Sequence, residues 1–443
     1  MKKRSFDNLP PLSKDEALNI LAKPISQLKL SSDYYKAVHH LYNFPGADTE
    51  HALLKLVESP LNDEPISIAR RKAVEILASH GCLNAIPAIG KCLESFDTYL
   101  VESSVWALQE LGCKEQKLIN IMLNLLDDPK QNRRLLIQAL SNLGVMSLLP
   151  YIKLYLQDMS LSSGILGASI AALNKLTGDT SNIKDLVKFL SLPNQNDRQC
   201  AVNDVINSGE TNLLPYVLKT PVAPSFRIRA LNEMWPEGIE ELNGLDLFCV
   251  IDSLIRDDPN DLELPNLEHE ISSTKDNIVS LFDTDFSKSC LALRALNKSN
   301  SEIIWPVLSQ YLDEITRDYG ALYFAMILFR SIPDWNEEAL AKIREVTLSC
   351  LGSQWPDFIK FKPVAILALM KQDPSVVSEN MSQWLNQDLT PYWVSRYAAL
   401  IALESLLEKE KNPNLVRILL RSQRDPHRFI SGKAKRVELK LLR

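Results

Sequence analysis

The chain has 443 residues, 46% hydrophobic and 23% charged, so it is too apolar for a disordered protein and long enough for about three domains or one repeat array. A formal net charge of −6 argues against a nucleic-acid-binding surface. Glycine is scarce, with 14 residues against 24 prolines, and glycine-rich phosphate loops are missing. Composition therefore favours a mostly helical protein without nucleotide chemistry.

The sequence carries no signal for membrane insertion, secretion or metal binding. No apolar stretch reaches the ~18–20 residues of a membrane helix. The sequence begins Met-Lys-Lys-Arg, but prolines and acidic residues follow where a signal peptide has its apolar core. The seven cysteines form no C-x-x-C pair, and the six histidines lack metal-ligand spacing. We expect a protein of the reducing cytoplasm with free thiols and no metal site.

The first predicted helix begins at the capping box Ser13-Lys14-Asp15-Glu16 and runs to Leu21. In such a box the serine side chain accepts a backbone N–H while the glutamate reaches back to the serine N–H. Another helix is predicted over 32–42. We expect residues 1–60 to form a helical cap over the apolar face of the first repeat.

Residues 61–256 carry a repeat of about 32 residues. Five helical segments place an apolar anchor at spacings of 31, 32, 33 and 32, and a shorter amphipathic segment precedes each of them. Each of the five ends in a glycine, which we expect to cap the helix in the left-handed conformation. The anchors are Leu77, Leu108, Leu140, Leu173 and Val205. One helical pair cannot bury both of its faces, so neighbouring pairs must stack. The predicted fold is an all-α, HEAT-like α/α solenoid of helical hairpins.

The repeat of about 32 residues becomes less regular after Gly238. An acidic run interrupted by Pro259 and Pro265 predicts an irregular connection and a helix over 257–300. Helical hairpins are predicted again over 301–443, as the pairs 302–312 with 319–329, 337–351 with 358–370, 376–385 with 392–407, and 414–422 with 428–442. The chain is thus predicted to have two helical halves with a joint between them.

Two polar columns run along the second helices of the repeats. Six residues before the anchors stand Arg71, Glu102, Arg134, Gly167 and Gln199, and two before them stand Glu75, Trp106, Gln138, Ala171 and Asn203. The columns are four residues apart and so share one helix face. A solvated face carries charges by default, but an exposed tryptophan is unusual there. The mixed charges disfavour a phosphate-binding groove.

Aromatic residues gather in the last third of the chain. Ten of the nineteen Trp and Tyr residues fall there, namely Trp305, Tyr311, Tyr319, Tyr323, Trp335, Trp355, Trp384, Tyr392, Trp393 and Tyr397. Most are expected to pack in the core, and a subset is expected to line a binding site for a flat apolar ligand. Asp318 lies beside Tyr319 at a predicted helix start, where an N-cap explains it equally well.

Five segments resemble the E/F-type phycobilin lyases, which are HEAT-repeat proteins that attach linear tetrapyrroles to cysteines of phycobiliproteins. They are 68–74 (IARRKAV), 99–108 (YLVESSVWAL), 131–138 (QNRRLLIQ), 194–199 (NQNDRQ) and 221–231 (PVAPSFRIRAL). Length and motif order are similar to the single-chain branch that serves phycoerythrin, the CpeY-like and MpeZ-like proteins. The motifs cover about residues 60–260; beyond them the resemblance rests on length and aromatic content.

The resemblance implies phycoerythrobilin as a substrate, with no cofactor, and a phycoerythrin cysteine as the nucleophile. Arginines would pair with the two bilin propionates. Trp106 or Tyr319 would stack on the pyrrole rings. Asp318 or Glu102 would transfer the proton that the addition requires. The residues implied for substrate binding are Arg71, Trp106, Arg134, Arg227, Arg229 and Arg396, and those implied for catalysis are Asp318, Tyr319 and Glu102.

Some members of the family also isomerise the bilin. The phycoviolobilin type carries the motif Asn-His-Cys-Gln-Gly-Asn, which the segment 79–84 (SHGCLN) does not match. Isomerisation of that type is therefore not expected, while isomerisation to phycourobilin stays open.

Three hypotheses follow for a cyanobacterial cytoplasmic protein. The first is a bilin lyase acting on a phycoerythrin subunit, with or without an accessory lyase or chaperone subunit. The second is a non-enzymatic HEAT-repeat scaffold or chaperone for phycobiliprotein and phycobilisome assembly. The third is a general protein-interaction solenoid. None involves nucleic acid or a membrane.

Overall fold

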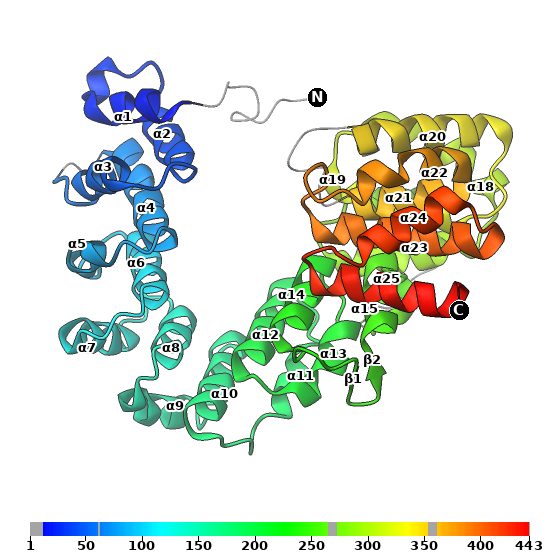
Figure 1. Ribbon diagram of the computed structural model, residues 1–443. Helices are drawn as coiled ribbons and strands as arrows, with labels where there is room; N and C mark the ends of the chain where they lie inside the picture. Colours follow the sequence, from blue (N-terminus) through cyan, green and yellow to red (C-terminus); the bar gives the residue numbers. More distant parts are fainter. Residues whose placement is uncertain (1–11, 61–62, 265–272, 353–360, 443) are drawn as a thin grey trace. The chain divides into compact units, whose positions relative to one another are not determined.

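Figure 1 shows the computed structural model, which describes residues 12–60, 63–264, 273–352 and 361–442. Over these ranges helices dominate, and the strands form one antiparallel hairpin of β1 (Glu241–Leu242) and β2 (Leu245–Asp246). Successive helices pack pairwise, so the predicted all-α, HEAT-like fold is confirmed. In the described part of the chain no helix is both long and apolar enough to cross a membrane.

The contacts divide the chain into two compact units, Met1–Leu186 and Val187–Arg443. This division falls within the run 61–256 that the sequence treats as one series of repeats. The four-part division of the sequence stays a prediction, and residues 265–272 of its connection and Trp355 of its aromatic set lie outside the described residues.

The first unit consists of helical pairs in chain order (Figure 1). Its helices are α1 (Lys14–Ala22), α2 (Asp33–Leu41), α3 (Ala47–Val57), α4 (Glu64–Ser79), α5 (Ile86–Cys92), α6 (Thr98–Glu110), α7 (Gln116–Asn124), α8 (Arg133–Asn142), α9 (Leu149–Tyr155) and α10 (Ser163–Thr177), with the short 3-10 turns η1 (Ile25–Gln27), η2 (Leu83–Ala85), η3 (Leu125–Asp127) and η4 (Met146–Leu148). The second helices α4, α6, α8 and α10 contact one another in succession.

Local sequence explains where these helices begin and end. The predicted capping box at Ser13 is present, and Asp97, Asn132 and Ser162 cap α6, α8 and α10 with their side chains. The glycines that end the second helices at 81, 112, 144, 178 and 209 have φ between 62° and 75°. This left-handed conformation is the one that glycine adopts at least cost, and it confirms the predicted glycine caps.

A polar ladder joins the second helices of the first unit. Asn142 Nδ2 donates to Gln109 Oε1 at 3.0 Å, and Lys175 Nζ donates to Asn142 Oδ1 at 2.6 Å. The contacts link residues 33 positions apart, the length of one repeat. The repeat therefore aligns polar side chains between neighbours as well as apolar ones.

Helix α11 (Asp185–Phe189) spans the division, and the second unit follows. Its helices are α12 (Gln195–Ser208), α13 (Leu214–Lys219), α14 (Pro224–Met234), α15 (Leu247–Arg256), α16 (Thr274–Val279), α17 (Phe286–Leu296), α18 (Ser301–Ile315), α19 (Tyr319–Ser331), α20 (Glu337–Gly352), α21 (Lys362–Gln372), α22 (Pro374–Trp384), α23 (Trp393–Lys409), α24 (Pro413–Ser422) and α25 (Arg428–Leu441), with η5 (Thr211–Leu213), η6 (Pro259–Asp261) and η7 (Ser280–Phe282). The second helices α17, α19, α21, α23 and α25 follow one another in contact.

Helix α15 packs against the second helices α21 and α23, which lie more than a hundred residues further along the chain. Polar contacts anchor it: Tyr397 Oη donates to Asp252 Oδ1 at 3.0 Å, and Lys433 Nζ lies 2.7 Å from Asp252 Oδ2. A Cβ on Gly432 would lie 2.5 Å from the ring of the buried Phe248, so only glycine allows this approach. The packing of α15 brings its C-terminal end beside the N-terminal turns of several second helices.

Candidate functional site

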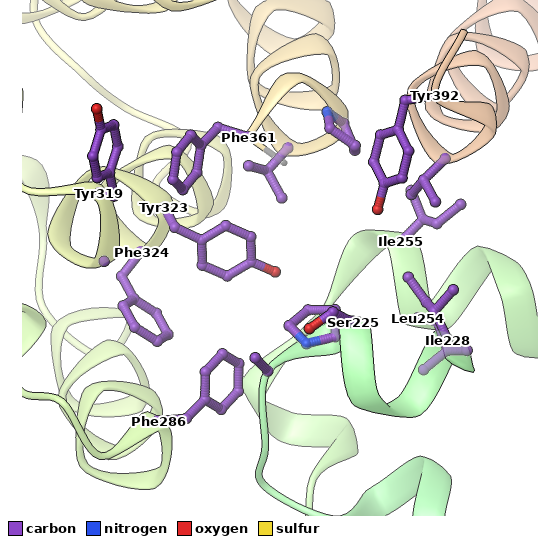
Figure 2. A pocket seen from close by; sticks show the side chains of 16 residues that line it. Ser225, Ile228, Leu254, Ile255, Phe286, Tyr319, Tyr323, Phe324, Phe361 and Tyr392 are labelled. Atoms are coloured by element: carbon purple, nitrogen blue, oxygen red, sulfur yellow. The ribbon is translucent and has the colours of Figure 1, made fainter. Parts of the chain in front are cut away.

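The second unit contains a cavity of about 290 Å³ beside the C-terminal end of α15 (Figure 2). Its walls come from the first turns of the second helices α14, α17, α19, α21 and α23. The lining residues are Ala223, Pro224, Ser225, Ile228, Leu254, Ile255, Phe286, Tyr319, Gly320, Tyr323, Phe324, Phe361, Pro363, Val364, Tyr392 and Val394. We call this cavity the aromatic pocket. Among the described residues, none of the side chains that line it carries a charge.

Flat rings form one wall of the aromatic pocket. Tyr319 and Phe361 stack with their ring centroids 5.7 Å apart and their planes 5° apart. Tyr323 lies one helical turn after Tyr319 and contacts the same Phe361 ring at 6.3 Å. Phe286 and Phe324 continue the wall with centroids 5.1 Å apart. Such a wall matches the faces of a planar conjugated molecule.

The Tyr323 hydroxyl points away from Tyr319 into the cavity (Figure 2), and an ion pair holds it. It donates to Asp257 Oδ2 at 2.5 Å, while Arg227 Nη2 lies 2.5 Å from Asp257 Oδ1. Asp257 ends α15 in a left-handed conformation, with φ 46° and ψ 54°, that residues other than glycine rarely adopt. The backbone is thus held in an uncommon conformation where the buried carboxylate meets both partners.

Burial and the neighbouring Asp257 carboxylate raise the pKa of Tyr323 well above its usual value. The phenol therefore keeps its proton at neutral pH and donates it to Asp257. A hydroxyl that donates to a carboxylate becomes a stronger acceptor through its lone pairs. The arrangement suits a ligand that presents an N–H group to the Tyr323 oxygen.

Asp257→Ala is expected to lower the free energy of unfolding of the second unit by about 3–5 kcal/mol, because the buried Arg227 guanidinium loses its counter-charge. Denaturant unfolding followed by circular dichroism measures this loss. The control is Asp258→Ala, where the exposed neighbour only caps η6 and should cost about 1 kcal/mol. Equal losses in the two variants would show that the ion pair does not stabilise the unit.

Two of the residues implied for catalysis adjoin the aromatic pocket. Tyr319 lines it, and the preceding Asp318 is exposed and caps α19 by accepting the Ala321 N–H at 2.8 Å. The N-cap interpretation of Asp318 is therefore confirmed, and its carboxylate lies next in sequence to the lining residues Tyr319 and Gly320. Its catalytic role stays a prediction.

The arginines predicted in the second unit have internal partners. Arg227 and Arg396 are each 2% exposed and pair with Asp257 and Asp425. The exposed Arg229 contacts Asn203 and Glu233. A bilin propionate would have to displace an internal carboxylate from either buried guanidinium.

The remaining predicted residues belong to the first unit. Arg71 pairs with Asp97 at 2.8 Å and lies over the Tyr99 ring, and Arg134 donates to the Gly164 carbonyl at 2.8 Å. All four predicted residues lie on second helices: Arg71 on α4, Glu102 and Trp106 on α6, and Arg134 on α8. Trp106 is half-buried against the core of this unit, and Glu102 is half-buried beside it on the same helix face. Their roles toward a ligand stay predictions.

Sequence reasoning did not single out Asp257 or Phe361, and it placed Tyr323 only in the general aromatic set. The spacing of Tyr319 and Tyr323 at i and i+4 was the available signal, since it puts both rings on one face. Over the described residues no cluster of His, Cys, Asp and Glu suits a metal ion.

Comparisons with known proteins add the following. No protein-family model matches the chain. The bilin biosynthesis protein CpeY of Synechococcus sp. (strain WH8020) is 35% identical over 415 residues, covering 93% of this chain and 99% of the relative. The uncharacterized phycocyanin operon protein Y of Pseudanabaena tenuis (strain PCC 7409) is 30% identical over 407 residues, covering 90% and 93%. The complex of CpcE and CpcF of phycocyanin lyase from Nostoc sp. PCC7120 aligns with 57% of this chain and 98% of its own, at 23% identity and a TM-score of 0.47.

Proposed function

Since this chain belongs to the family of CpeY-type bilin biosynthesis proteins, related to the E/F-type phycobilin lyases, we propose that it is itself a bilin lyase. Its substrate would be phycoerythrobilin, and its product a thioether between the bilin and a cysteine of a phycoerythrin subunit. The observation that carries the proposal is the aromatic pocket, whose uncharged lining and parallel rings suit pyrrole rings.

The size of the pocket indicates which part of the bilin it would take. At about 290 Å³ it lies near the lower end of the ~300–1,000 Å³ range of ligand pockets, so it holds one end of a four-ring molecule. The two outer rings of a bilin carry no propionate, and an uncharged pocket takes such a ring without burying a carboxylate. The Tyr323 oxygen would accept the N–H of that ring.

The proposed reaction is a net addition without oxidation or reduction. The acceptor thiol forms a C–S bond to the exocyclic carbon of the ethylidene group, and the adjacent ring carbon takes up a proton as the C=C double bond becomes single. The acceptor supplies the sulfur, and the thiol proton balances the added proton. Cys290 is buried near Asp257. Burial, together with the Asp257 charge, raises the pKa of its thiol well above the usual value, as expected for an unreactive structural cysteine.

Asp318 is the proposed proton carrier of the addition. Its exposed carboxylate caps α19 next in sequence to the lining residues Tyr319 and Gly320 and is reachable from solvent, so it can exchange protons between turnovers. A side chain in this role contributes typically ~10²–10⁴-fold to a rate. The pocket would hold the bilin while the acceptor cysteine approaches from outside, which fixes the geometry of the addition.

Co-expression with a bilin supply and each phycoerythrin subunit in turn tests the proposal. The expected result is a coloured acceptor whose bilin stays attached under denaturing conditions. The absorption maximum of the product then separates simple attachment from attachment with isomerisation to phycourobilin. An acceptor that stays colourless with every subunit overturns the lyase proposal, and bilin binding without covalent transfer favours the scaffold hypothesis.

A further inference from the structure

A second cavity, of about 340 Å³, lies in the same unit between the C-terminal ends of α22 and α24. The loops that lead into α23 and α25 complete its walls. Unlike the aromatic pocket it is polar, and the charged residues that line it are Asp388, Arg421, Arg424 and Asp425. We call it the arginine cavity.

The two arginines of this cavity differ from the buried arginines of the unit. Arg421 and Arg424 are exposed, and neither guanidinium makes a hydrogen bond or ion pair within the described residues. Both carboxylate oxygens of Asp425 are already bound by Arg396, at 2.8 and 3.1 Å. Asp388 is then the one acid in the described lining left to offset two cations, so the cavity is positive and suits carboxylate ligands.

The loop of residues 388–392 borders both cavities. Asp388 lines the arginine cavity and Tyr392 lines the aromatic pocket, so their Cα atoms, four residues apart, are at most ~14 Å from each other. Arg396 Nη1 donates to the carbonyls of Thr390 and Pro391 at 2.8 Å each while the same guanidinium holds Asp425. The buried Arg396 therefore fixes the loop between an apolar site and a cationic site.

We propose that the arginine cavity binds the propionate carboxylates of a bilin whose outer ring occupies the aromatic pocket. The inference rests on the proposed function, because that function supplies a ligand with uncharged rings at its ends and two carboxylates near its middle. The uncharged aromatic pocket cannot accept those carboxylates without burying unpaired charge. Arg421 and Arg424 provide paired N–H donors at a site that the fixed loop keeps close to Tyr392.

The experiment compares phycoerythrobilin with its dimethyl ester, which keeps the rings and removes both negative charges. Absorbance titrations of the full chain are made on the wild type and on the double variant Arg421→Gln, Arg424→Gln. The wild type should bind the free acid roughly tenfold more tightly than the ester, as expected for one or two exposed charge-assisted contacts. The double variant should bind both forms with the wild-type affinity for the ester.

The matched control is Arg417→Gln, an exposed arginine one turn earlier on α24 that does not line the cavity and should keep the tenfold preference. Unchanged circular dichroism shows that each variant is folded. A double variant that still prefers the free acid tenfold overturns the inference while leaving the proposed function intact. A wild type that binds neither form contradicts the proposed function and this inference together.

Discussion

Asp318→Asn is expected to lower the rate of bilin attachment at least ~100-fold while leaving bilin binding unchanged. Asparagine caps a helix about as well as aspartate, so α19 should keep its N-terminal hydrogen bond to Ala321. The amide cannot carry the proton that the addition requires. Single-turnover attachment to a phycoerythrin subunit measures the rate, and absorbance titration measures bilin binding.

The matched control for this variant is Asp373→Asn, which makes the same change at the N-cap of α22, away from the aromatic pocket. It should attach bilin within about twofold of the wild-type rate. If Asp318→Asn also retains the wild-type rate within about threefold, the carboxylate serves only as a helix cap and the proton comes from elsewhere.

Tyr323→Phe is expected to weaken bilin binding by roughly 10–100-fold. The change keeps the ring that contacts Phe361 but removes the hydroxyl that Asp257 polarises. Hydrogen bonds to charged or strongly polarised groups contribute about 1.5–3 kcal/mol, which corresponds to that range of affinity. Because Asp257 keeps Arg227 as its partner, the unit should remain folded. Titration of each variant with phycoerythrobilin measures the change.

Tyr319→Phe provides the comparison on the same helix. Its ring stacks on Phe361 and stays in place, so binding should change by less than about threefold. Equal losses in the two variants would mean that the hydroxyl held by Asp257 has no special role. Because the pKa of Tyr323 is raised well above its usual value, wild-type affinity should also stay constant as pH rises through 10. Ionisation of an unshifted phenol would instead change it in that range.

The fold could be predicted from the sequence because it rests on local and periodic signals. The capping box at Ser13 and the glycines that end the second helices are read directly from residue type and spacing. The repeat of about 32 residues then requires neighbouring helical pairs to stack, and this holds without knowledge of the rest of the chain. The position of α15 could not be predicted, because its contacts with Tyr397 and Lys433 join residues 145 and 181 positions apart.

The candidate site was predictable only in part. The aromatic content of the last third pointed to Tyr319, but the partners of the arginines were hidden by their separation in sequence. Arg71 meets Asp97 after 26 residues, Arg227 meets Asp257 after 30, and Arg396 meets Asp425 after 29. In each case an arginine on one second helix pairs with an aspartate about one repeat later. With these partners known from the structure, the recurrence marks arginines that join neighbouring repeats.

The most direct test of the central claim, that the aromatic pocket holds the bilin, is an absorbance titration of Ser225→Trp with phycoerythrobilin. Ser225 is exposed at the second position of α14, after Pro224, and borders the pocket, so an indole there fills the cavity. Ser375 is exposed at the same position of α22, after Pro374, and supplies the control variant Ser375→Trp. The account predicts that Ser225→Trp loses bilin binding at least ~30-fold while Ser375→Trp binds like the wild type. Wild-type binding by Ser225→Trp would contradict it.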